Sequence, residues 1–227
     1  MASRTIPNPG PRAATAGASA AAAPSPAPQS VAASELGGLL ARVAPPQRLS
    51  LDCFDTILWR RTADPVDVFY ELQQHPAFRQ RGLAPVLRVR AESQARKLQW
   101  ARHGSFEVGL AHIYRAAFPG LDDAEVAALA EAELEAEMRA CYAFPGAVEL
   151  LRDAARRRLP VMVVSDTYLS QDQLQRLLAH CLPADALAAI DRIVCSNEHG
   201  ASKRGGLFPR VPQRRPLAAR ALLPLGG

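Results

Sequence analysis

Short apolar runs that end in polar residues constrain the fold of this chain more than any other feature. The first run, residues 49–51, ends at Asp52. The second, residues 161–164, is continuously apolar and ends at Ser165 and Asp166. Continuous apolar runs of this length are typical of strands buried on both faces of a parallel sheet. The sequence therefore predicts an α/β fold with a parallel sheet.

A third strand is predicted over residues 190–195, ahead of Lys203. Parallel strands place their carboxyl ends at one edge of the sheet, where ligands bind in α/β proteins. We therefore expect Asp52, Ser165 and Lys203 to meet there. These side chains suit phosphoryl chemistry, because the acid can attack, the hydroxyl can bind a phosphoryl oxygen and the lysine can offset negative charge. Singly, each residue has an ordinary explanation as a turn cap or a surface lysine.

About ninety residues between the first two runs show helical periodicity and helix caps, with no strand pattern. Asp64 before proline, Ser105, and Asp122 three residues before a glutamate each predict the start of a helix. Gly104 predicts the end of a long helix that begins near residue 83. The sequence therefore predicts four helices inserted as one α-helical unit.

The charge distribution argues against nucleic-acid binding. The net charge is +5, from 27 basic and 22 acidic residues, but residues 204–227 hold five arginines and no acid. The rest of the chain is therefore neutral, and the basic tail is expected to be a solvated segment. No apolar run approaches membrane-spanning length, and the four cysteines have no metal-ligand spacing. We expect a cytoplasmic protein with no nucleic-acid or membrane partner, and its oligomeric state stays open.

Three motifs resemble those of the haloacid dehalogenase (HAD) superfamily. Residues 51–58 (LDCFDTIL) resemble its first motif, residues 163–166 (VVSD) its second, and Lys203 with the GGLF of residues 205–208 its third. The resemblance covers about residues 47–210 and depends on the order and spacing of the motifs. It implies a Rossmann-like parallel sheet core into which an α-helical cap of the subfamily I type is inserted.

Composition and the resemblance together predict a division of the chain into five segments. Residues 1–33, rich in Ala, Pro and Ser, are predicted to be disordered, because they cannot bury enough apolar surface to offset their ordering entropy. Residues 34–61 and 144–210 form the α/β core, residues 62–143 form the helical cap, and residues 211–227 form an atypical basic tail.

The resemblance also implies roles for individual residues. Asp52 is the nucleophile and forms an aspartyl-phosphate, and Thr56 braces the loop behind it. Ser165 binds the phosphoryl group, and Lys203 neutralises Asp52 and the phosphate. Asp52 and the backbone carbonyl of Phe54 bind Mg²⁺, a cation that prefers oxygen ligands. Four arginines either face the substrate from the cap side or lie on a solvated helix face: Arg60, Arg61, Arg90 and Arg96.

The sequence departs from the superfamily pattern directly after the nucleophile. Phosphatases of the superfamily usually carry a second aspartate where this chain has Phe54, and glycine is usual at the position of Asp55. A phenyl ring cannot donate a proton, and such acid–base help contributes roughly two to four orders of magnitude in rate. An aromatic residue at this position also occurs in the true dehalogenases. Phosphatase action is therefore expected to be slow, or to need a leaving group with a low pKa.

The fourth motif should end a strand with Gly-Asp, but Gly227 stands at the position of the acid. A frameshift or truncation near Val211 would explain both the missing acid and the basic tail. Mg²⁺ binding is then expected to be weak, with Asp166 as a partial substitute ligand. With these departures, the resemblance implies an impaired Mg²⁺-dependent phosphatase that acts on a small phosphorylated metabolite. The alternatives are a carbon–halogen hydrolase and a catalytically inactive fragment or pseudoenzyme.

Overall fold

The computed structural model describes residues 32–42, 46–211 and 222–225. The segment predicted to be disordered lies outside these residues, except for its last two. The basic tail is described only at Val211 and at residues 222–225, so the position of Gly227 also lies outside the described part of the chain.

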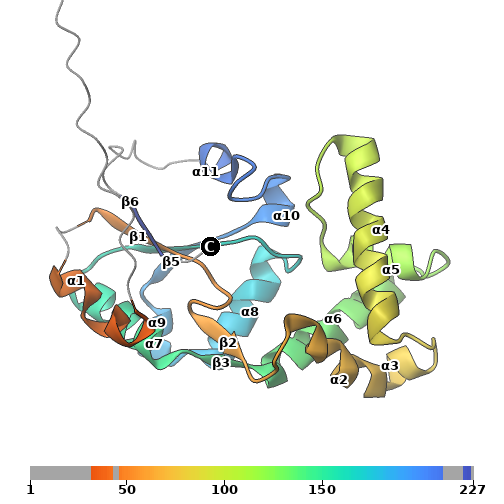
Figure 1. Cartoon of the computed structure of the whole chain (residues 1–227), viewed down its shortest axis with the longest axis horizontal. Helices are drawn as coiled ribbons and strands as arrows, with labels where there is room; N and C mark the ends of the chain where they lie inside the picture. Colours follow the sequence, from red (N-terminus) through yellow and green to blue (C-terminus); the bar gives the residue numbers. More distant parts are fainter. Residues whose placement is uncertain (1–31, 43–45, 212–221, 226–227) are drawn as a thin grey trace, which may run out of the picture. The chain divides into compact units, whose positions relative to one another are not determined.

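The core is a sheet of four parallel strands in the order β5-β4-β1-β6 (Figure 1). β4 and β5 lie on one side of β1, and β6, the last strand in sequence, lies on its other side. The order therefore reverses at β1, and ligands of open α/β sheets bind at such a reversal, beyond the carboxyl ends of the strands. The four strands are β1 (Arg48–Leu51), β4 (Val161–Ser165), β5 (Ile190–Cys195) and β6 (Leu222–Leu225).

The predicted α/β fold with a parallel sheet is confirmed, and the apolar runs explain its central strands. All five residues of β4 are buried, as are the last three of β1. β4 pairs with β1 through Leu51 and Val163, and with β5 through Ser165 and Cys195. This register brings the polar residues that follow β1 and β4 to the same edge of the sheet.

β2 and β3 are two short antiparallel strands that pair with each other, and all the secondary structure between them is helical (Figure 1). We call these helices the helical insertion. The structure has five α-helices and a 3₁₀ turn there, where the sequence predicted four helices. The bounds of these elements are β2 (Leu58–Arg60), η2 (Pro65–Asp67), α2 (Val68–Gln74), α3 (Pro76–Arg79), α4 (Pro85–His103), α5 (Leu110–Ala117), α6 (Asp123–Ala140) and β3 (Cys141–Ala143).

The predicted helix boundaries at Gly104 and Asp122 are confirmed, and the one at Ser105 is wrong. Gly104 ends α4 with φ of 65°, and Asp122 caps α6 by accepting the backbone N–H of Glu125 at 2.8 Å. Ser105, predicted to cap the next helix, lies five residues before α5. Its hydroxyl instead donates to the carbonyl of Gly200 at 3.0 Å and accepts the N–H of Glu107. A tertiary contact with the core therefore keeps residues 105–109 out of the helix.

The remaining helices flank the strands of the core. α7 contacts η1, α1 and α9, while α8 contacts β5, β3 and α6. No helix in the described residues is long and apolar enough to cross a membrane. These elements are η1 (Ala33–Gly38), α1 (Leu39–Arg42), α7 (Pro145–Arg156), α8 (Gln171–Cys181), α9 (Ala184–Leu187), α10 (Ser196–His199) and α11 (Leu207–Arg210).

A fully buried ion pair joins three helices of the insertion. Arg88 on α4 donates to both carboxylate oxygens of Glu133 on α6, at 2.8 and 2.7 Å. The hydroxyl of Tyr114 on α5 donates to the same carboxylate. A buried pair of this kind contributes little net stability over an apolar pair, but loss of one partner leaves a charge without compensation. The pair therefore fixes how the three helices pack.

We expect Glu133→Gln to lower the free energy of unfolding by about 3 kcal/mol, because the buried guanidinium of Arg88 loses its fully buried counter-charge and keeps only the more exposed Glu92. The double variant Arg88→Met/Glu133→Leu should recover most of this loss. Glu131→Gln serves as the control. Glu131 lies on α6 like Glu133, but its ion pair with Arg176 is exposed, so its loss should have a much smaller effect. Urea unfolding of the four chains tests the prediction, which equal losses in the Glu131 and Glu133 variants would contradict.

Candidate active site

Asp52 is the first residue after β1, at the point where the strand order reverses. Its Oδ1 accepts the backbone N–H of Cys53 at 2.7 Å, and its Oδ2 lies 2.5 Å from the ammonium nitrogen of Lys203. The side chains of Asp52 and Lys203 are only 15% and 18% exposed. Reduced contact with water strengthens the attraction between these charges, which holds the carboxylate in one orientation.

A tight turn follows Asp52 and explains one departure from the motif pattern. The carbonyl of Cys53 accepts the N–H groups of Ile57 and Leu58, at 2.8 and 2.9 Å. Asp55 adopts φ of 58°, in the left-handed region that glycine enters most easily and that aspartate tolerates better than most residues. The position where the family pattern has glycine therefore has a glycine-like backbone conformation in this chain.

Lys203 also contacts the polar residues that follow β4. Its backbone N–H donates to Oδ1 of the exposed Asp166 at 2.8 Å. Lys203 is thus bonded to both acids, to Asp52 through its side chain and to Asp166 through its main chain. Ser165 is buried at the end of β4, the strand adjacent to β1.

The sequence-predicted site residues are therefore brought together to different degrees. Direct contacts join Asp52, Asp166 and Lys203, whereas Ser165 and Thr56 are placed near this edge by their positions on the backbone. Thr56 is half-buried in the turn after Asp52. The catalytic roles predicted for Asp52, Ser165, Lys203 and Thr56, and the metal-binding role predicted for Asp166, stay predictions.

The groups at this edge that could bind a metal offer oxygen atoms as ligands. The carboxylates of Asp52 and Asp166 and the backbone carbonyl of Phe54 are the hard ligands that Mg²⁺ prefers. No cluster of three or more His, Cys, Asp or Glu side chains suited to a metal occurs in the described parts of the chain. Proteins commonly bind Mg²⁺ through one or two carboxylates, with water and substrate phosphate as the other ligands. The residues present fit such a site.

The carboxylate of Glu137, near the end of α6, joins the two loops of the site, and the sequence did not reveal this. Arg60 donates to both of its oxygens at 2.9 Å, and the hydroxyl of Tyr168 donates to Oε1 at 3.2 Å. The guanidinium of Arg60 lies 4.2 Å from the ring centre of Phe54. Glu137 therefore connects the turn after Asp52 with the loop after Asp166.

The electrostatics of this junction keep its partners in their hydrogen-bonding forms. Burial lowers the pKa of Arg60, but the hydrogen bond and charge of Glu137 outweigh it and raise that pKa overall. Burial also raises the pKa of Tyr168 well above its usual value, and the carboxylates of Glu133 and Glu137 raise it further. At neutral pH Arg60 is therefore charged and Tyr168 is protonated, as donation to Glu137 requires.

A second contact that the sequence did not reveal joins the insertion to the end of β5. The hydroxyl of the buried Ser196 donates to Glu107 at 2.5 Å and accepts the N–H of Thr167 at 3.1 Å. Close by, the carbonyl of Tyr168 accepts the N–H of Leu110 at 3.2 Å. The sequence pattern placed residues 105–109 in a helix, and this hid the loop that carries Glu107 to Ser196.

No family model matches this chain, and no curated protein matches it. Solved structures do resemble it, among them an L-2-haloacid dehalogenase with 14% identity and a TM-score of 0.47, covering 78% of this chain and 76% of that one. A putative HAD-hydrolase from Bacillus subtilis bound to magnesium has 16% identity and a TM-score of 0.46, covering 79% and 78%. A putative phosphoglycolate phosphatase from Lactobacillus delbrueckii subsp. bulgaricus has 16% identity and a TM-score of 0.33, covering 69% and 67%. At these identities no residue role passes from those proteins to this chain.

The bond between Asp166 and the backbone of Lys203 generates a test of the site geometry. We expect Asp166→Ala to speed hydrogen exchange of the Lys203 amide about 10-fold, because loss of such a bond costs about 1–1.5 kcal/mol. Asp166→Asn keeps a carbonyl acceptor and should leave the exchange rate close to that of the parent chain. Hydrogen–deuterium exchange of a peptide spanning residues 200–207 measures both variants. Equal rates in the alanine variant and the parent would refute this geometry.

Proposed function

We propose that the chain is a HAD-type hydrolase that removes phosphate from a small phosphorylated metabolite, with Asp52 as nucleophile. The observation that carries this proposal is the 2.5 Å contact between Lys203 and Asp52 at the carboxyl end of β1. A carboxylate held at a strand-order reversal beside a cation suits attack on an anionic phosphoryl group. The three motifs in their order and the parallel sheet support the same reading.

In the first step a carboxylate oxygen of Asp52 forms a bond to phosphorus, and the ester bond to the leaving-group oxygen breaks. That oxygen takes a proton from water. In the second step water attacks the aspartyl-phosphate, which releases inorganic phosphate and regenerates Asp52. Lys203 offsets the negative charge gathered in both steps, and Ser165 donates a hydrogen bond to a phosphoryl oxygen.

Mg²⁺ would be held by Asp52, the carbonyl of Phe54 and Asp166. When bound, it neutralises phosphoryl charge and orients the substrate. The position of Gly227, where the resemblance implies a further acid, lies outside the described residues. Both carboxylates already accept hydrogen bonds from Lys203, which compete with a metal for the same oxygens, so we expect Mg²⁺ to bind weakly and turnover to be reduced.

Asp52→Asn should lower the Mg²⁺-dependent hydrolysis of p-nitrophenyl phosphate at least 1,000-fold, roughly the loss seen when a nucleophile is removed. Asp55→Asn is the matched control, because asparagine tolerates the left-handed backbone of this exposed position. Steady-state rates of the parent and both variants decide the matter. Unchanged activity in the Asp52 variant would exclude this nucleophile, and an inactive parent chain would favour the pseudoenzyme or fragment.

Phe54 explains why turnover should be slow even with a complete metal site. Its ring packs against the guanidinium of Arg60 and carries no proton for the leaving group. Phe54→Asp should raise the hydrolysis of an alkyl phosphate by about 100-fold, at the low end of what general acid catalysis contributes. Hydrolysis of p-nitrophenyl phosphate, whose leaving group needs no proton, should change far less. Phe54→Leu controls for loss of the ring, and an equal gain in that variant would contradict the assigned role.

The aromatic ring of Phe54 also favours one second candidate function, hydrolysis of a carbon–halogen bond by the same carboxylate. In that reaction Asp52 attacks carbon, halide leaves, and no proton donor is needed at position 54. Release of chloride from a 2-haloacid without Mg²⁺, in a chain that lacks phosphatase activity, would identify this alternative.

A further inference from the structure

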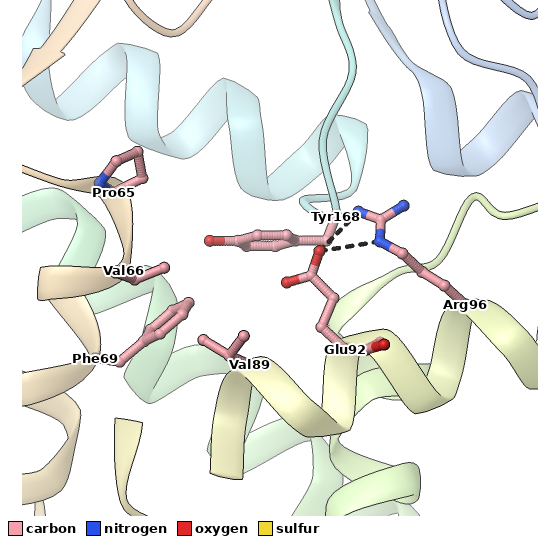
Figure 2. A pocket seen from close by; sticks show the side chains of 8 residues that line it. Pro65, Val66, Phe69, Val89, Glu92, Arg96 and Tyr168 are labelled. Carbon is pink, nitrogen blue, oxygen red and sulfur yellow. Dashed lines mark hydrogen bonds and ion pairs between the residues drawn. The ribbon is translucent and has the colours of Figure 1, made fainter. Parts of the chain in front are cut away.

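A pocket of about 440 Å³ lies where the helical insertion meets the loop that follows β4. Figure 2 shows the ring of Tyr168 pointing toward Val66 and Phe69, with Val89 on the neighbouring helix. Glu92 and Arg96 lie near the backbone end of Tyr168. Pockets that hold small organic molecules have volumes of about 300–1,000 Å³ and mostly apolar walls. The size and lining of this pocket therefore suit a small organic group.

Tyr168 connects the pocket with the candidate active site. It comes two residues after Asp166 and three after Ser165, and its side chain lines the pocket. Its carbonyl accepts hydrogen bonds from Leu110 and from the side chain of Asn197, both at 3.2 Å. Its hydroxyl is held by Glu137. The loop that carries Ser165 and Asp166 therefore presents a fixed aromatic wall to the pocket.

The charged groups of the pocket wall are already paired with one another. Arg96 donates to Oε1 of Glu92 at 3.0 and 2.7 Å, and to the carbonyl of Phe106 at 2.9 Å. Arg88 donates to the other oxygen of Glu92 at 3.1 Å. Burial raises the pKa of Glu92, but the two arginines outweigh it and lower that pKa overall, so the carboxylate is ionised at neutral pH. A charged ligand would have to break these pairs, whereas an uncharged one need not.

On the basis of the proposed phosphatase function, we propose that this pocket binds the organic part of the substrate and selects an uncharged apolar or aromatic group. The phosphoryl group lies at Asp52 and Lys203, and the apolar group lies between Tyr168, Phe69 and Val89. Sugar phosphates and substrates with a second charge are disfavoured, because the wall offers them mainly apolar surface and charges that are already satisfied.

Equilibrium binding of two non-hydrolysable phosphonates to the full chain with Mg²⁺ tests this proposal. Phenylphosphonate should bind at least about 10-fold more tightly than methylphosphonate, since its extra carbons leave water. Val89→Asp puts a charge in the pocket and should reduce this preference to less than about 3-fold. Val86→Asp is the matched control, because Val86 lies one turn earlier on α4, is 55% exposed and does not line the pocket. It should keep the preference of the parent chain.

Circular dichroism of both variants verifies that they are folded. Equal binding of the two phosphonates to the parent chain would overturn the pocket proposal, as would equal effects of the Val86 and Val89 substitutions. Inorganic phosphate separates this failure from that of the proposed function. If phosphate binds, and Lys203→Met abolishes its binding, while phenylphosphonate has no advantage, then the pocket assignment alone is wrong. If neither phosphate nor a phosphonate binds, the phosphatase proposal fails, and the pocket proposal fails with it.

Discussion

The ion pair between Asp52 and Lys203 joins residues that are 151 positions apart in the chain. It is possible only because β1, β4 and β5 lie side by side in parallel, which brings their carboxyl ends to one edge. The backbone of Lys203 is in turn bonded to Asp166. Two acids that follow different strands are therefore held by one residue, and the chemistry proposed for the edge depends on this arrangement.

Glu137 extends that arrangement into the helical insertion. Its carboxylate binds Arg60, which packs on Phe54, and it accepts the hydroxyl of Tyr168. Both loops of the candidate site are thus attached to the last turns of α6. A buried ion pair adds little net stability compared with an apolar contact, but it has strict geometric requirements. The junction therefore orients the loops relative to the insertion, and a shift of α6 would displace both loops.

The sequence predicted the features that depend on local pattern and missed those that depend on distant partners. β4 was predictable because its residues are continuously apolar, and α6 because Asp122 and Glu125 form a capping box. β2 and β3 were missed because three residues are too few to show a period. The role of Glu137 was hidden as well, because α6 carries four glutamates at alternate positions from 131 to 137. Only the positions of Arg60 and Arg88 in space show that Glu133 and Glu137 are the buried ones.

The pairing of Glu92 with Arg96 affects which ligands the pocket can bind. Glu92 and Arg96, the charged groups that line the pocket, already have hydrogen-bond partners within the protein before any ligand binds. A ligand then gains affinity chiefly by removing apolar surface from water, and a second charge on it would lose hydration without finding a free partner. Under the proposed function, specificity for the phosphoryl group and for the organic group is divided. We expect the first to depend on Lys203 and Asp52, and the second on the shape of the surface between Tyr168 and α4.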